Sequence, residues 1–106
     1  MIHRLIDKLT LKLVKNDAIL LLAAYEKAGP EWVKRADVIE GIGTFAAADT
    51  KCTKLSTNRL ESLGFFECEV RANDKFARCK WVRVTEAGRK FLNGCYKHAQ
   101  GKGVAA

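Results

Sequence analysis

The sequence lacks the motifs on which most enzyme active sites are built. It has no glycine-rich phosphate loop, no nucleophile elbow and no His-Glu-x-x-His segment. Its acidic residues are scattered singly, so no pair of carboxylates is spaced for general acid–base catalysis. The only two histidines, His3 and His98, fall near predicted helix ends, where side chains are solvated. The sequence therefore indicates a protein that is not an enzyme.

Long apolar runs are also missing. The longest, from Ala18 to Tyr25, is far shorter than the roughly 20 residues that cross a bilayer. The N-terminus mixes both charges through its apolar positions and has no small-residue cleavage site, which argues against a signal peptide. We therefore expect a cytoplasmic protein with no membrane partner. A chain of 106 residues is long enough for one hydrophobic core, so one domain is expected.

Paired cysteine motifs are absent as well. Cys52, Cys68, Cys79 and Cys95 are separated by 16, 11 and 16 residues, which leaves no Cys-x-x-Cys pair. In a reducing cytoplasm we expect them to pack as small apolar side chains. A redox sensor stays an alternative, because Cys68 and Cys79 are expected on opposite arms of one hairpin, where nearby positive charge lowers a thiol pKa. A zinc site would need ligands from distant segments, so we expect no metal and no cofactor.

Acidic residues are scarce in the second half of the chain. Residues 51–106 hold twelve Lys/Arg against five Asp/Glu, whereas residues 1–50 hold seven of each. The formal net charge of +7 therefore lies entirely in the second half. Such self-repulsion does not stabilise a fold, and it indicates a polyanionic partner. We expect these charges to gather on a single convex surface that fits a duplex.

Apolar residues that are present recur at helical spacing near the N-terminus. The face of a first helix is formed by the stripe Ile2, Leu5, Ile6, Leu9 and Leu13. Asn16 and Asp17 then give an N-cap signal before a central helix over Ala18–Tyr25, which is apolar on nearly every side. A short helix is predicted from Glu31 to about Glu40. Its expected inward residues are Trp32, Val33, Ala36 and Ile39.

A third helix is predicted to begin between Thr44 and Thr50 and to run to Leu63, where Gly64 supplies a left-handed stop. At about 100° per residue, the inward positions are Cys52, Ser56, Leu60 and Leu63, with Leu55 at the margin. The outward positions are Thr50, Lys51, Lys54, Thr57, Asn58 and Glu61. All but Glu61 suit base edges or phosphates. The alternative is an ordinary surface helix with a polar outer face.

A basic hairpin follows the third helix. Residues 66–71 and 77–84 alternate apolar and polar side chains as half-buried strands do, and Asn73-Asp74 offers turn chemistry. The basic residues of its tip and returning arm are Arg71, Lys75, Arg78, Lys80 and Arg83. They suit a phosphate backbone, and the alternative is an edge hairpin that uses charge to prevent aggregation. Thr85 is then predicted to cap a last helix that ends near His98.

This order of elements resembles the winged helix-turn-helix proteins, particularly the small MarR-like, PadR-like and HxlR-like bacterial regulators. The resemblance covers about residues 16–98. It rests on residues 56–66, which look like a recognition helix entering the first wing strand. It also rests on residues 82–92, which are similar to the return strand and the threonine-capped helix after the wing. In these families an aliphatic side chain is more usual at the place of Thr57.

The resemblance implies a mainly α fold with a small β-hairpin (α+β), in which a three-helix core and a wing are flanked by terminal helices. The expected divisions are an N-terminal helix at 1–15, the winged domain at 16–85, a C-terminal helix at 86–100 and a frayed tail at 101–106. It also implies sequence-specific binding to double-stranded DNA. The helix residues Lys51, Lys54, Thr57 and Asn58 would then enter the major groove, with Thr50 beside them. The wing residues Arg71, Lys75, Arg78 and Lys80 would lie on the backbone or the minor groove.

Such regulators bind paired half-sites as twofold dimers, so the resemblance favours a homodimer. The candidate dimer surfaces are the first-helix stripe and a terminal stripe of Phe91, Leu92 and Cys95, although each could fold back on its own monomer. Two other functions stay open, a winged-helix module that binds a protein and an RNA-binding module. The sequence does not specify an operator or an effector.

Overall fold

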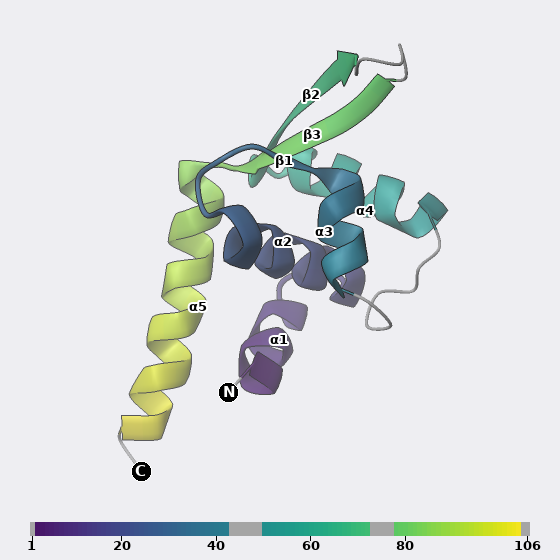
Figure 1. The fold of residues 1–106 in the computed structure, drawn as a ribbon. Helices are drawn as coiled ribbons and strands as arrows, with labels where there is room; N and C mark the ends of the chain where they lie inside the picture. The colour runs from purple at the N-terminus through teal and green to yellow at the C-terminus, as the bar shows by residue number, and fades with distance from the viewer. Residues whose placement is uncertain (1, 43–49, 73–77, 105–106) are drawn as a thin grey trace.

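The computed structural model describes residues 2–42, 50–72 and 78–104, with side chains at 4–40, 53–72 and 78–97. The helices and strands follow one another as α1 (Ile2–Thr10), α2 (Lys15–Ala28), β1 (Val33–Lys34), α3 (Arg35–Ile42), α4 (Thr50–Ser62), β2 (Phe66–Ala72), β3 (Arg78–Val84) and α5 (Glu86–Val104). Figure 1 shows the helices packed around α2 and the β2–β3 hairpin projecting from the body. The predicted α+β winged-helix fold is confirmed.

Helix α2 is central because its apolar residues face every side. Residues 18–22 are buried, and α2 contacts α1, α3, α4 and α5 as well as β1 and β3. The expected N-cap at Asn16 or Asp17 is wrong. The helix begins at Lys15 after the extended residue Val14, with no side-chain cap, and Asp17 lies inside the first turn. Gly29 ends the helix with a φ of 55° and donates its N–H to Tyr25 O at 2.8 Å.

The first-helix stripe completes the core of its own monomer. Leu5, Leu9 and Leu13 are buried, and α1 contacts both α2 and α5. Leu92, from the terminal stripe, is fully buried, while Phe91 and Cys95 pack partly against the same core. Burying these side chains inside one chain removes most of the apolar surface that was expected to be available to a second copy. The two predicted dimer stripes are therefore mainly core.

A third strand joins the hairpin in a sheet of order β1-β3-β2. Val33 of β1 pairs with Val82 of β3, which in turn pairs with Cys68 of β2. The predicted helix over residues 31–40 is thus wrong in its first part, because residues 33–34 form this strand and α3 starts at Arg35. Among residues 35–40 of α3, Val38 is buried, whereas Ala36 is exposed.

The junctions around the hairpin follow the predicted caps. Gly64, two residues after the end of α4, has a φ of 81°, and Phe65 N–H donates to Leu60 O at 2.9 Å. Thr85 caps α5, since its hydroxyl accepts the N–H of Gly88 at 3.1 Å. Helix α5 continues to Val104, beyond the end expected near His98 and into the segment predicted to be frayed. Across the described residues, none of the helices combines the length and apolar character needed to span a bilayer.

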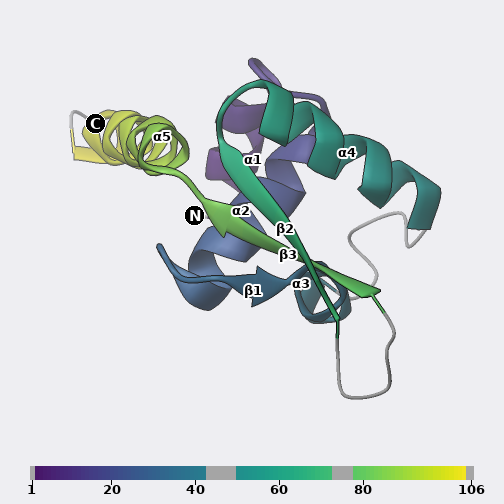
Figure 2. The same ribbon diagram turned by 90° about the horizontal axis from the view of Figure 1, so that it is seen from above.

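Two views show where α4 lies relative to α5. In Figure 1 and in Figure 2, which looks from above, α4 and α5 lie on opposite sides of α2. The hairpin crosses between them and extends over the α4 side. The chain therefore presents the α4 side and the α5 side as two separate surfaces.

Candidate nucleic-acid interface

The inward face of α4 is more polar than the sequence predicted. Among residues 53–62, its buried side chains are Thr53, Ser56, Thr57 and Leu60, and the side chain of Cys52, also expected inward, lies outside the described residues. Leu63, expected inward, is 53% exposed, and Leu55 is also exposed. Residues 53, 56, 57 and 60 follow the three- and four-residue spacing of one helical face, so the true inward direction is centred on these positions. The predicted helix face was rotated because it was anchored on Leu63.

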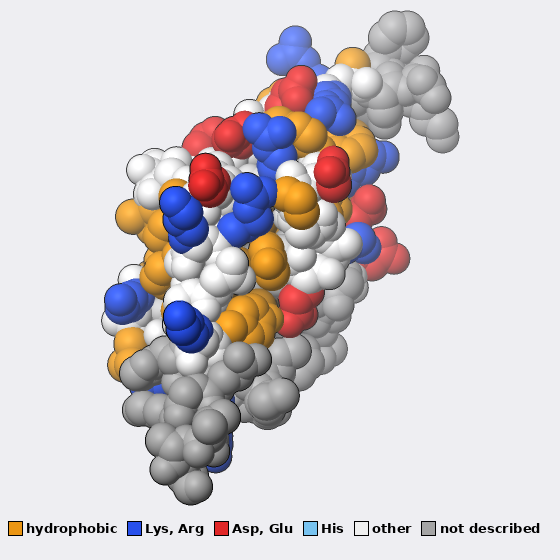
Figure 3. All heavy atoms as spheres, turned by 90° about the vertical axis from the view of Figure 1, so that its left-hand side faces the viewer, with side chains coloured by type: hydrophobic (Ala, Val, Ile, Leu, Met, Phe, Trp, Pro, Cys, Tyr) orange, Lys and Arg blue, Asp and Glu red, His pale blue; other side chains and the backbone are white. Residues whose placement is uncertain are grey.

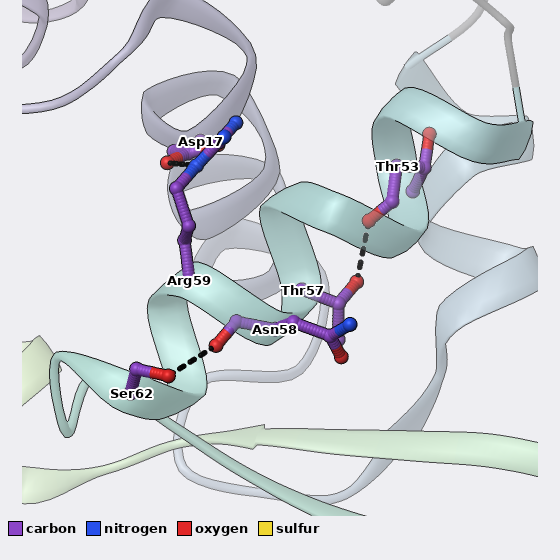
Figure 4. A network of polar contacts seen from close by, with 6 residues as sticks. All are labelled: Asp17, Thr53, Thr57, Asn58, Arg59 and Ser62. Carbon is purple, nitrogen blue, oxygen red and sulfur yellow. Dashed lines mark hydrogen bonds and ion pairs between the residues drawn. The ribbon is translucent and has the colours of Figure 1, made fainter.

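Thr57 was predicted to contact DNA, and this placement is wrong. Its side chain is fully buried and donates a hydrogen bond to the Thr53 carbonyl oxygen at 2.8 Å (Figure 4). A threonine can be buried at low cost when its hydroxyl is satisfied by the carbonyl four residues earlier. The sequence carried one signal that this position is buried, since an aliphatic side chain is more usual there in the families that the sequence resembles.

An ion pair fixes α4 against α2. Arg59 lies beside Asp17, with Nε 2.8 Å from Oδ2 and Nη2 3.0 Å from Oδ1 (Figure 4). The Asp17 side chain is 2% exposed and that of Arg59 is 49% exposed. The charge of Arg59 is therefore paired with a buried carboxylate. The sequence did not indicate that Arg59 and Asp17 are partners.

Two predicted DNA-binding residues of α4 are exposed as expected. Lys54 and Asn58 lie on its outer face, and the nearby Ser62 hydroxyl donates to the Asn58 carbonyl at 3.0 Å (Figure 4). The backbone of Thr50 and Lys51 lies in α4, but their side chains fall outside the described residues. Lys75 also lies outside the described residues.

The strand register sorts the hairpin's basic residues onto two faces. Alternate residues of a strand point to opposite faces of the sheet, so Arg78 and Lys80 share the face of buried Val82. Lys80 Nζ lies 3.4 Å from Asn58 Oδ1, in a long hydrogen bond that joins hairpin and helix. We call the surface formed by Lys54, Asn58, Arg78 and Lys80 the helix–hairpin face.

Arg71 lies on the other face of the sheet. It pairs with Cys79 in the register, and its guanidinium carbon is 5.2 Å from the Trp32 ring centroid and 4.7 Å from that of Trp81. Arg71 also forms a 3.0 Å ion pair with Glu69. Distances below about 6 Å to an aromatic centroid are those of cation–π contacts. Arg71 is thus engaged in an aromatic cluster on the opposite face from Lys80.

Other basic residues extend this aromatic cluster. Arg83 lies 4.8 Å from the Trp32 centroid and forms an ion pair with Glu67, while Lys34 Nζ is 5.7 Å from the Trp81 centroid. The prediction of a single basic surface is therefore wrong. Among the described residues, the cations of the second half divide between the helix–hairpin face, the outer sheet face, the Asp17 ion pair and α5.

The thiols do not form a sensor pair in this structure. Cys68 pairs with Val82 and Cys79 with Arg71, so the two cysteines are three positions apart along the hairpin, about 10 Å. This separation exceeds the reach of a disulfide. Burial, followed by the nearby Glu61 carboxylate, raises the pKa of Cys68 to about 11, which opposes the lowering expected from positive charge. No three His, Cys, Asp or Glu side chains among the described residues are grouped to hold a metal.

The comparisons with known proteins support the fold through solved structures. No family model and no curated protein matches the chain. TA0346 from Thermoplasma acidophilum, a proposed transcriptional regulator, is 20% identical and superposes with a TM-score of 0.62 over 85% of this chain and 84% of that one. The protein smu.1704 from Streptococcus mutans UA159 is 17% identical, with a TM-score of 0.64 over 82% and 80% of the two chains.

A third solved structure is similar. It is a protein from Methanosarcina mazei Go1, also proposed to be a transcriptional regulator, with 11% identity and a TM-score of 0.59 over 92% of this chain and 78% of that one. These likenesses show that the chain shares the fold of these proteins. They do not assign the chain to the MarR, PadR or HxlR family.

Proposed function

We propose that this protein is a transcriptional regulator that binds double-stranded DNA through the helix–hairpin face. In this proposal α4 enters the major groove, where Lys54 and Asn58 contact bases or phosphates, and Arg78 and Lys80 contact the backbone. Thr50, Lys51 and Lys75 remain predicted contacts. The observation that carries the proposal is the joining of an exposed polar helix face to the basic hairpin through Lys80 and Asn58.

The structural neighbours add support from the fold. Two of the three proteins above are proposed transcriptional regulators, and their folds match most of the length of this chain. Fold alone does not determine function, so the proposal depends on the side chains of the helix–hairpin face. The aromatic cluster argues for duplex DNA over single-stranded RNA, because Arg71 already occupies the space over both tryptophan rings that bases would use for stacking.

Mobility-shift titration with random duplex DNA, single-stranded RNA and structured RNA at several salt concentrations tests this function. Each phosphate contact made by lysine or arginine releases counterions, so duplex affinity should fall steeply as salt rises. Affinity that does not depend on salt would contradict the proposed contacts. Preference for either RNA would favour the RNA-binding alternative, and no binding to any of them would favour a module that binds protein.

A matched pair of variants locates the interface. Lys54→Ala removes a cation from the helix–hairpin face, whereas Lys90→Ala removes an exposed cation of α5 that pairs only with Glu86 among the contacts described for it. Lys54→Ala should weaken duplex binding and reduce the salt slope by about one, and Lys90→Ala should change neither. Asn58→Ala should reduce discrimination between selected and random duplexes, because an amide side chain reads adenine edges. Equal effects of the two lysine variants would remove the assigned interface.

We propose further that the regulator is a homodimer, as paired half-sites require. Since Leu5, Leu9, Leu13 and Leu92 are buried in the monomer, the interface would use other residues of the chain. Selection of bound sequences from a random duplex pool should yield a palindrome. Sedimentation as an 11.8 kDa monomer at high micromolar concentration, with an asymmetric selected site, would contradict the dimer.

A further inference from the structure

A hollow lies between α1 and α5, on the side away from α4. Its volume is about 490 Å³, within the range of small-molecule sites. Apolar and basic side chains line it together, the apolar ones being Leu11, Phe91 and Cys95 and the basic ones Lys8, Lys12 and Lys90. Among the residues that the structure describes, none of those lining the hollow is acidic. Figure 3, which views the α5 side, shows Lys and Arg side chains standing among hydrophobic ones.

The apolar part of the hollow is open to a ligand. Leu11, which lines the hollow, is 78% exposed, so its side chain is available to an apolar ligand. Gly94 leaves the space open, because a Cβ built there would meet no atom within 4 Å. Phe91, also on α5, is partly buried against the core and stacks on Phe65 with ring centroids 4.8 Å apart. This stacking holds the Phe91 ring in place. A hydrocarbon or aromatic body would fill this space.

The basic side chains of the hollow favour a ligand with a negative charge. Lys12 and Cys95 line the hollow together, and the positive charge of Lys12 acts on the Cys95 thiol. Lys90 pairs with Glu86 at 3.5 Å, but both side chains are about three-quarters exposed, and such pairs are weak. Three ammonium groups around an apolar lining complement a molecule with one anionic end and one apolar end. A second copy that met this surface with its own equivalent surface, as in a twofold dimer, would instead bring the same lysines into this space.

We propose that the α1–α5 hollow binds a small amphipathic organic anion, with its apolar body against Leu11 and Phe91 and its carboxylate or sulfonate beside Lys12 and Lys90. The site is on the α5 side, opposite α4, and its assignment does not depend on DNA binding. Its natural ligand would belong to the class of short fatty acids or aryl carboxylates.

Isothermal titration with three ten-carbon probes below their micelle concentrations tests the charge. Decanoate is anionic, decanol is neutral and decyltrimethylammonium is cationic, while their apolar bodies match. Saturable binding of decanoate at one site per chain, at least about 10-fold tighter than that of decyltrimethylammonium, is the expected result. Equal binding of the anion and the cation, or no saturable binding of decanoate, would overturn the proposal.

Variants then locate the site within the chain. Lys12→Glu should weaken decanoate about 10-fold or more and leave decanol nearly unchanged, whereas Lys54→Glu, with the same charge change on the α4 side, should leave both unchanged. Gly94→Phe places a ring in the hollow from an exposed helical position and should abolish binding of both decanoate and decanol, with a thermal melt confirming the fold. Decanoate binding that survives Gly94→Phe, or that falls equally in Lys54→Glu, would overturn the assignment to this hollow.

Discussion

The Arg59 guanidinium on α4 holds the Asp17 carboxylate on α2 with two hydrogen bonds, from Nε to Oδ2 at 2.8 Å and from Nη2 to Oδ1 at 3.0 Å. Two parallel bonds of this kind fix orientation as well as distance. Because α2 is the centre of the core, the pair joins α4 to the core. In this orientation of α4, Lys54 and Asn58 are exposed.

Removing Arg59 should therefore destabilise the fold. Arg59→Ala leaves the buried Asp17 carboxylate without this partner, and we expect a loss of about 2–4 kcal/mol in the free energy of unfolding. Arg78→Ala removes an exposed arginine of the hairpin and should cost less than about 0.5 kcal/mol. Urea unfolding followed by circular dichroism measures both. Similar losses in the two variants would show that the Asp17 pair does not secure α4.

The same ion pair shows what the sequence could not predict. The two residues are 42 positions apart, and Asp17 before an apolar run has the appearance of an N-cap. The local signals at Gly64, at Thr85 and along the alternating strands of the hairpin were reliable, because these features depend on near neighbours in the chain. Strand β1 was missed because its two residues become a strand only by pairing with β3.

The candidate site was predicted only in part for the same reason. Exposure of Lys54 and Asn58 followed from helical periodicity, but the rotation of α4 depends on long-range contacts, so Thr57 was assigned to the wrong face. Alternation correctly gave the hairpin, yet which face meets α4 is decided by packing. Arg71 was consequently grouped with Lys80, although tertiary packing places Arg71 among tryptophans.

Two glycines of α5 should respond in opposite ways to alanine. A Cβ at Gly88 would lie 2.6 Å from Phe65 O and 2.9 Å from Val84 Cγ1, whereas one at Gly94 would meet nothing within 4 Å. Gly88→Ala should cost about 1–3 kcal/mol through overpacking. Gly94→Ala should stabilise by about 0.5–1 kcal/mol, because alanine is the better helix former. Thermal or urea unfolding of the two variants checks this contrast, and a stabilising Gly88→Ala would contradict the close approach of Phe65 to α5.

Cys68 should react slowly in the folded protein. Burial and the Glu61 carboxylate raise its pKa to about 11, so less than about one part in a thousand is thiolate at pH 7.5. Peptide mass spectrometry after iodoacetamide treatment should show much slower alkylation of Cys68 in the folded chain than in guanidinium-unfolded chain. Mild peroxide should likewise leave it unmodified. Rapid modification of folded Cys68 at neutral pH would revive the redox-sensor interpretation.

The raised pKa of Cys68 also predicts how the stability of the fold depends on pH. The folded-state pKa of Cys68 is higher than the value of about 8.5 for an unfolded cysteine, so the unfolded chain loses its proton first as pH rises. The contribution of Cys68 is fully present below about pH 8.5 and is lost as pH approaches 11. Cys68→Ala should remove part of the stability decline over this range, as unfolding at a series of pH values would show.

Arg71→Ala should lower stability without affecting DNA binding, and Arg78→Ala should do the reverse. Arg71 lies over Trp32 and Trp81 on the outer sheet face, so Arg71→Ala should lower the free energy of unfolding by about 1–2 kcal/mol through lost cation–π contacts. Its charge faces away from Lys80, and the salt slope of duplex binding should stay unchanged. Arg78→Ala should instead leave stability within about 0.5 kcal/mol and reduce the salt slope by about one. Mobility shifts over a salt series, at a temperature where both variants are folded, measure the slopes.

An equal loss of slope in both variants would mean that DNA contacts both faces of the hairpin, because a phosphate contact contributes to the slope wherever it is made.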